Sequence, residues 1–253
     1  MSGHSKWATI KHKKGAADAK RGKIFSKIAK EMTIVAKNGG GDPGNNPTLR
    51  TLLAKAKSVN MPNDNIERAI KKGTGELAAD ALEEITYEGY GSGGVGLVVK
   101  VLTDNKNRAA SEVRNIFKKH GSDFSGLGSV SRSFERKGSI MIPAAAGLTE
   151  DKVMEVALGA GADDMLTEEG GFTVTCQPNA FGEVSAAIEA AGIAFDRENS
   201  QVGLIPLTKA SVKDVAVAKS VNKFVAALED HDDVQDVYTN MDIDESIADQ
   251  VDE

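Results

Sequence analysis

The segment KIFSKIAKEMTIVAK, residues 23–37, decides how the N-terminal part of the chain folds. Its apolar residues recur three and four positions apart, which is the spacing of an amphipathic α-helix. At about 100° per residue the apolar side chains fall on one face of such a helix, and four lysines fall in a narrow stripe on the opposite face. These lysines, called the cationic stripe below, are Lys23, Lys27, Lys30 and Lys37.

Two shorter helices are predicted after this one. The sequence NGGGDPG at 38–44 ends the first helix, because glycine adopts the left-handed cap and proline cannot continue the helix. The second helix begins at Asn46-Pro47, with asparagine as the cap and proline in the first turn. The third follows Met61-Pro62 and stops at Gly73. We therefore expect a three-helix bundle.

Charge is divided very unevenly along the chain. The first 75 residues hold sixteen Lys and Arg against five Asp and Glu, a local charge of +11 in a chain of overall charge −6. The remainder must carry −17. Such asymmetry gives information about binding partners rather than about the fold. A basic segment of this kind predicts that the partner is a polyanion such as nucleic acid. Aromatic residues are only 5% of the chain, so binding has to rest on phosphate contacts rather than on a stacking platform.

The candidate nucleic-acid-binding residues lie in a basic arm over residues 1–21, on the cationic stripe and on the second and third helices. Any single lysine is more often an ordinary solvated residue, so the prediction rests on their combined excess. Trp7, the sole tryptophan, either stacks on a base or anchors the arm to the bundle. The candidates are Lys6, Trp7, Lys11, His12, Lys13, Lys14, Lys20, Arg21, Lys23, Lys27, Lys30, Arg50, Arg68, Lys71 and Lys72.

The acidic remainder is predicted to form two α+β domains. Strands at 85–90 and 95–102, a helix at 107–120 and a strand at 131–135 form the first unit. The sequence GSGGVG at 91–96 matches the GxGxxG pattern of phosphate-binding loops, but it joins two strands, so we interpret it as a hairpin turn.

Residues 138–206 are predicted to follow the order β-α-β-β-α-β of a ferredoxin-like domain, with its last strand at 193–197. A long helix built on Val212 to Leu228 and a strand at 234–238 then return to the first unit, and an acidic tail from Asp242 is expected to be flexible. The expected fold class is a multidomain α+β protein, in which an N-terminal three-helix bundle precedes an α+β domain that carries an inserted ferredoxin-like domain. The expected boundaries are 1–78, 79–136 with 204–241, 137–203 and 242–253.

Catalytic and metal-binding patterns are missing from the sequence. No histidine has metal-ligand spacing to another histidine or to Cys176, and the latter is interpreted as a small residue on a strand. His231 lies in the run DHDD at 230–233, which is more ordinary as a helix-to-strand turn than as a cation site. We therefore predict no enzyme activity, no catalytic or metal-ligating residues, no cofactor and no small-molecule substrate.

The expected location is the cytoplasm, without membrane association. The chain has no apolar run of eighteen residues and no signal-peptide core after Met1. A single cysteine suits a reducing compartment.

Several motifs together resemble the YebC/PmpR family. The N-terminal ones are GHSKW at 3–7, KRGKIF at 20–25, GGGDP at 39–43 and NIERAIKKG at 65–73. Later ones are YEGYG at 87–91, LTDN at 102–105, GSVS at 128–131 and DDVQ at 232–235.

The resemblance covers essentially the whole chain. It implies three domains, with a helical bundle first and a ferredoxin-like third domain inserted into the second. It also implies a cytoplasmic transcriptional regulator that binds DNA, or a translational activator at the ribosome as in related members that include a mitochondrial branch. One departure is the sequence SDFSGL at 122–127, followed by Arg132-Ser133 in place of more apolar residues, which puts any partner contact of that loop in doubt.

Two functions therefore remain open. The first is DNA binding through phosphate contacts, although few Asn, Gln or Arg side chains stand on the cationic helix face to distinguish bases in the major groove. The second is binding to ribosomal RNA, which suits a lysine-rich arm that orders on structured RNA. An enzyme that uses the ferredoxin-like domain is a weaker third hypothesis, because fold analogy alone supports it. The sequence leaves the oligomeric state open.

Overall fold

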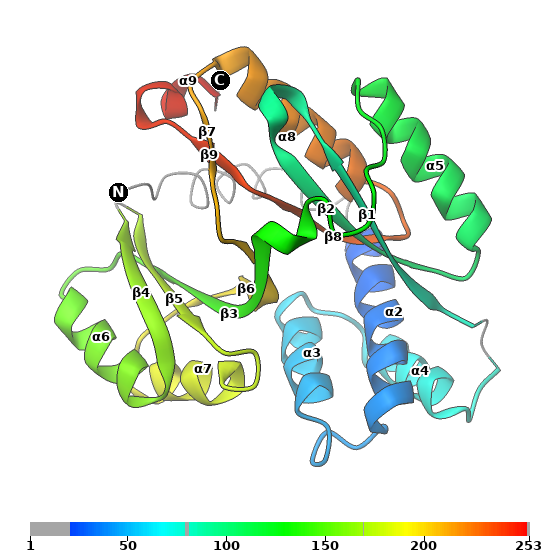
Figure 1. The fold of residues 1–253 in the computed structure, drawn as a ribbon. Helices are drawn as coiled ribbons and strands as arrows, with labels where there is room; N and C mark the ends of the chain where they lie inside the picture. The colour runs from blue at the N-terminus through cyan, green and yellow to red at the C-terminus, as the bar shows by residue number, and fades with distance from the viewer. Residues whose placement is uncertain (1–20, 79–80, 169, 252–253) are drawn as a thin grey trace. The chain divides into compact units, whose positions relative to one another are not determined.

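The computed structural model describes residues 21–78, 81–168 and 170–251. These residues form two compact units. One comprises residues 21–131 with 219–239, and the other comprises residues 132–218 with 240–251. Each unit therefore contains segments that are distant in the sequence (Figure 1).

The first unit begins with the predicted helical bundle. Ile28 and Met32 of the first helix pack against Leu49, Leu52 and Ile66 of the other two. The local signals act as expected, since the side chain of Asn46 accepts a hydrogen bond from the backbone N–H of Leu49 at 3.1 Å. The helices are α2 (Arg21–Gly39), α3 (Pro47–Ser58) and α4 (Asn63–Thr74), the last capped by the left-handed Gly75.

Gly73 permits α4 to approach α2 closely. A Cβ atom at this position would collide with the backbone carbonyl of Thr33 and lie 2.7 Å from the Cβ of Ala36. The glycine is therefore needed for packing between two helices, and it also lies close to the end of α4.

We expect Gly73→Ala to lower the free energy of unfolding by about 1–3 kcal/mol, the usual cost of overpacking a close contact. The measurement is urea unfolding followed by circular dichroism. Gly22→Ala is the matched control, since a Cβ atom there meets nothing within 4 Å and α2 tolerates alanine. Equal stability of the two variants would contradict the close approach.

A three-stranded antiparallel sheet forms the rest of the first unit. The strand order is β1-β2-β8, so the last long strand joins the hairpin made by the first two, as predicted. The GSGGVG segment is the turn of that hairpin, which confirms its structural interpretation. Phe117 packs edge-on against Phe224 at 4.9 Å between ring centroids, in the core that covers one face of the sheet. The elements are β1 (Glu83–Tyr90), β2 (Gly96–Thr103), α5 (Lys106–Lys119), α8 (Val215–Glu229) and β8 (Val234–Thr239).

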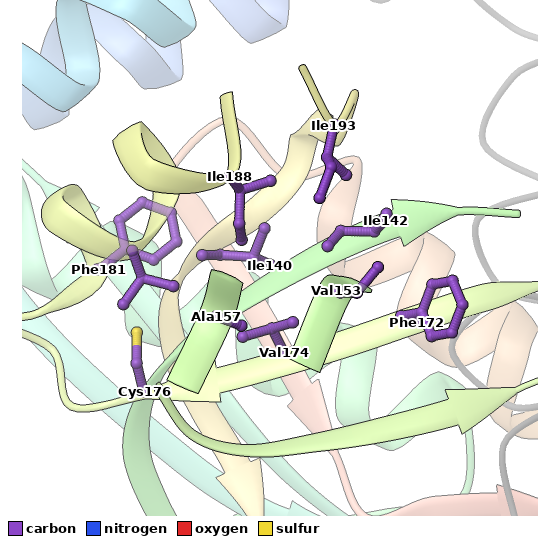
Figure 2. Close-up of a cluster of buried hydrophobic side chains, with 11 residues drawn as sticks. Ile140, Ile142, Val153, Ala157, Phe172, Val174, Cys176, Phe181, Ile188 and Ile193 are labelled. Carbon is purple, nitrogen blue, oxygen red and sulfur yellow. The ribbon is translucent and has the colours of Figure 1, made fainter. Parts of the chain in front are cut away.

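The second unit contains a four-stranded antiparallel sheet in the order β4-β5-β3-β6. Two helices alternate with its strands in the order β-α-β-β-α-β, and their apolar faces form one core with the sheet. Figure 2 shows Cys176 beside Phe181 at one end of this core and Phe172 at the other. The elements are β3 (Phe134–Pro143), α6 (Glu150–Gly159), β4 (Ala162–Glu168), β5 (Gly171–Cys176), α7 (Phe181–Ala190) and β6 (Asp196–Pro206).

Cys176 is a structural residue in this core. Its side chain is fully buried, and burial raises the pKa of the thiol to about 11. The thiolate is therefore strongly disfavoured at neutral pH, which is the opposite of a reactive cysteine.

Two strand predictions were wrong. Residues 131–133 form a 3-10 turn, and the strand that begins at Phe134 runs to Pro143 in the four-stranded sheet instead of completing the first one. The strand predicted at 193–197 begins at Asp196 and continues to Pro206, because residues 201–206 pair with β3. Local patterns showed strand-forming residues but not how far each pairing extends.

The C-terminal segment was also mispredicted. The tail from Asp242 was predicted to be flexible, but it is ordered through Val251. Ile243, Ile247 and Val251 are buried and hold it in place. Val212 lies in a short strand rather than in the long helix, and that strand pairs in parallel with the segment that begins at Met241. The elements are β7 (Ala210–Val212), β9 (Met241–Ile243), the 3-10 turn η3 (Glu245–Ile247) and α9 (Ala248–Val251).

Candidate nucleic-acid interface

Many candidate contact residues belong to the basic arm. Arg21 is the first residue of α2. Seven others lie outside the described residues, namely Lys6, Trp7, Lys11, His12, Lys13, Lys14 and Lys20.

The structure brings three lysines of the cationic stripe together on a turn of the same compact unit. This turn, residues 229–233, joins α8 to β8 and is called the acidic turn below. Lys23 Nζ lies 2.8 Å from both the carboxylate and the carbonyl oxygen of Asp230. Lys27 Nζ donates to the carbonyl oxygen of Glu229 at 2.7 Å, at the C-terminal end of α8 where a cation is favourable. The run DHDD is therefore a helix-to-strand turn, as predicted.

Lys30 reaches deeper, to a carboxylate that sequence reasoning had not singled out. Its Nζ lies 2.6 Å from Asp233 Oδ1, and the Asp233 residue is 4% exposed. The second carboxylate oxygen accepts hydrogen bonds from Thr103 at 2.9 Å and from Arg108 at 3.0 Å. One buried carboxylate thus joins α2, the end of β2, the start of α5 and the start of β8.

These partners control the ionisation of Asp233. Burial alone would raise the pKa of this carboxyl group, but the hydrogen bonds from Lys30, Arg108 and Thr103 outweigh burial and lower the pKa to about 2 from an ordinary value of 3.8. Asp233 is therefore ionised at any physiological pH. A neighbouring ring holds its backbone, since the N–H of Asp233 donates to His231 Nδ1 at 3.1 Å while His231 Nε2 contacts Glu112 at 2.8 Å.

Asp233 should make stability depend on acid pH. A carboxyl group whose pKa is lowered by folding stabilises the fold above its unfolded pKa, and this contribution disappears as pH falls through the folded pKa. We expect about 2 kcal/mol of unfolding free energy from this group to be lost between about pH 5 and pH 2. Urea unfolding over that range checks this: Asp233→Asn should flatten the pH dependence, and Asp123→Asn at an exposed position is the matched control. A pH profile unaltered by Asp233→Asn would contradict the assignment.

A second cationic group lines a cleft of about 480 Å³ between α2 and α4. Arg68 and Lys72 of α4 are exposed and line it, and among the described residues neither has a hydrogen-bond or ion-pair partner. Phe25, Met61 and Ala69 supply apolar surface to the same cleft. The cleft therefore combines two available cations with apolar surface, and the carboxylate residue Asp104 lines it as well.

The remaining two candidate residues, Arg50 and Lys71, already contact oxygen atoms of nearby residues. Arg50 donates to the carbonyl oxygens of Pro43 and Gly44, at 3.1 and 3.2 Å, and so closes the loop before α3. Lys71 lies 3.8 Å from Glu67 one turn earlier in α4, an exposed pair of small energetic value. Both stay accessible at the surface, but they lie on different helices.

A buried glutamate organises the loop that leads into residues 128–131. Glu88 is 1% exposed and accepts hydrogen bonds from the backbone N–H groups of Gly128, Val130 and Ser131, at 2.7–2.9 Å. Burial would raise the pKa of Glu88, but these bonds and one from the Ser131 hydroxyl lower the pKa from an ordinary 4.5 to about 2. The loop is thereby held in one conformation, with Leu127 at its tip 83% exposed.

The fold and these sites define a class: a multidomain α+β protein that begins with a basic helical bundle. Comparison with known proteins identifies it further. Residues 5–76 match the description "TACO1/YebC protein N-terminal domain", and residues 82–241 match "TACO1/YebC second and third domain". The chain belongs to the TACO1/YebC family.

Individual relatives align over nearly the whole chain. A probable transcriptional regulatory protein of Desulfotalea psychrophila is 50% identical over 251 residues, which are 99% of both chains. A protein of the same description from Treponema denticola is 54% identical over 97% of this chain and 98% of its own. The crystal structure of a conserved hypothetical protein from Aquifex aeolicus superposes with a TM-score of 0.84 at 44% identity, covering 95% of this chain and 98% of that one.

Membrane-spanning helices and metal clusters are both missing from the described part of the chain. Within residues 21–78, 81–168 and 170–251, no helix has the length and apolar character needed to cross a membrane. The same residues contain no group of three or more His, Cys, Asp or Glu side chains placed to hold a metal ion.

Proposed function

We propose that this chain is a non-enzymatic regulator that binds nucleic acid, and that it acts as a DNA-binding transcriptional regulatory protein. The observation that carries the proposal is the excess of +11 in the first 75 residues of a chain whose overall charge is −6. Relatives named as probable transcriptional regulatory proteins support it. We place the protein in the cytoplasm, without a small-molecule substrate.

Phosphate contacts are assigned to the basic arm and to the cations that lie at the surface of the bundle. Arg68 and Lys72 are the strongest of the described candidates, because they are exposed and line the same cleft. The acidic domains would be repelled by the same polyanion, which orients the bundle toward it. We further propose that residues 137–203 are an inserted ferredoxin-like domain, which the strand order β4-β5-β3-β6 supports.

One observation favours a second candidate, a translational activator that binds ribosomal RNA. Three of the four lysines of the cationic stripe are engaged by the acidic turn, so this part of the α2 face is not free to enter a major groove and distinguish bases. Recognition through phosphates and shape is typical of structured RNA.

Arg68→Gln combined with Lys72→Gln should weaken binding to labelled DNA about tenfold at low salt. The slope of log affinity against log salt should become shallower by about 0.9 for each phosphate that the variant no longer neutralises. Fluorescence anisotropy at several salt concentrations measures both quantities. Lys118→Gln with Lys119→Gln, at the end of α5, is the matched control because it removes the same charge outside the bundle. An equal weakening in the control would contradict a contact surface on α4.

Crosslinking in growing cells, followed by sequencing of the recovered nucleic acid, separates the two candidates. Promoter DNA is the expected product for a transcriptional regulator. Ribosomal RNA as the main product would overturn that role and support the translational one.

A further inference from the structure

The acidic turn presents to α2 the same chemistry that a nucleic-acid backbone would present. Asp230 and Asp233 offer carboxylate oxygens to Lys23 and Lys30, and a backbone carbonyl at the end of α8 accepts from Lys27. Asp232 adds a second carboxylate, 4.0 Å from Lys23 Nζ. Carboxylate and carbonyl oxygens thus follow the lysine stripe along successive turns of the helix, and they accept hydrogen bonds as phosphate oxygens would.

The contacts of the acidic turn differ in how readily they can be exchanged. The side chains of Lys23, Asp230 and Asp232 are 39%, 63% and 77% exposed, and ion pairs at such exposure contribute little net stability. Hydrogen bonding with Asp230, followed by its charge and that of Asp232, raises the pKa of Lys23, so the pair persists as an ion pair. Lys30 and Asp233 form the opposite case, because their side chains are only 25% and 5% exposed.

This difference in exposure distinguishes a permanent contact, between Lys30 and Asp233, from an exchangeable one, between Lys23 and Asp230. Separating Lys30 from Asp233 leaves a buried charge with fewer partners, which is costly. Separating Lys23 from Asp230 exchanges one solvated ion pair for another. The turn can therefore release the N-terminal end of α2 while remaining attached at Lys30.

Lys23, the exchangeable lysine, lies next to the cleft where Arg68 and Lys72 are available. Gly22, Ser26 and Lys30 of α2 line this cleft. Lys23 follows Gly22, so its side chain stands about 100° further round the same helix. A phosphate backbone that enters the cleft is thus next to the side of α2 that carries Lys23.

We propose that the acidic turn is a built-in competitor of nucleic acid for Lys23. This inference rests on the proposed function and concerns the regulation of the same surface. Phosphates that reach α2 displace Asp230 and Asp232, while the pair of Lys30 with Asp233 keeps the bundle attached to the sheet. The turn therefore lowers the affinity of α2 for anions that carry little charge or that do not reach α4. A phosphate backbone that also contacts α4 displaces the turn from α2.

The central test is Asp230→Asn combined with Asp232→Asn. Both side chains are exposed, so the fold should tolerate the change. Removal of the competitor should tighten binding of a labelled DNA duplex about three- to tenfold at low salt. Asp123→Asn with Glu155→Gln is the matched control, because it removes two exposed negative charges that do not belong to residues 229–233 and so corrects for general repulsion.

A second variant asks whether the freed lysine binds the phosphates. Lys23→Gln should weaken DNA binding markedly in the Asp230→Asn, Asp232→Asn background. The same lysine change should have a smaller effect in the native chain, where Asp230 already holds this lysine. Equal effects in the two backgrounds would contradict competition.

Displacement can also be followed directly in the native protein. Lys23 Nζ and Asp230 Oδ1 are 2.8 Å apart, so a zero-length carbodiimide crosslink should form between them and be quantified by peptide mass spectrometry. Saturation with the DNA duplex should lower its yield.

The outcomes separate the inference from the function on which it rests. If DNA binds and depends on Arg68 and Lys72, but the crosslink yield is unchanged and the turn variant matches its charge control, competition is wrong and the proposed function stands. If the native chain binds neither the DNA duplex nor a labelled ribosomal RNA hairpin, both proposals fail.

Discussion

The buried carboxylate of Asp233 is the interaction on which the first unit depends. It holds Lys30 of α2, Thr103 of β2 and Arg108 of α5 at distances of 2.6–3.0 Å. A buried charge needs such partners, because burial without them would be very unfavourable. The helical bundle is therefore attached to the sheet by an ionic contact as well as by apolar packing. Because Asp233 belongs to the acidic turn, the same contact holds that turn against α2.

Several motifs that carried the family resemblance meet in pairs in the folded chain. The motif YEGYG contributes Glu88, whose carboxylate holds the backbone of the motif GSVS. The motif LTDN contributes Thr103, which meets Asp233 from the motif DDVQ. These conspicuous residues are thus partners in two buried polar contacts, each of which joins segments distant in the sequence. These contacts give the motif residues a structural role.

Local signals predicted most of the elements. The lysine stripe, the Asn46 cap and the hairpin at 91–96 depend on residues close in sequence, so periodicity and turn chemistry were sufficient for them. Distant strand pairing sets how far β3 and β6 extend, and burial sets whether residues 242–251 are ordered or flexible. Those were the places where sequence reasoning failed, since no local pattern specifies a long-range partner.

By itself, the sequence determined that a basic bundle precedes acidic α+β domains, because charge and hydrophobic periodicity are properties of the chain before it folds. Tertiary structure alone decided what each cation faces. Lys23, Lys27 and Lys30 are indistinguishable from solvated lysines in the sequence, yet the fold places them on the acidic turn, whereas Arg68 and Lys72 line a cleft. The reason is physical: the partner of a charge is set by distance in space, and Asp233 lies 203 residues from Lys30 along the chain.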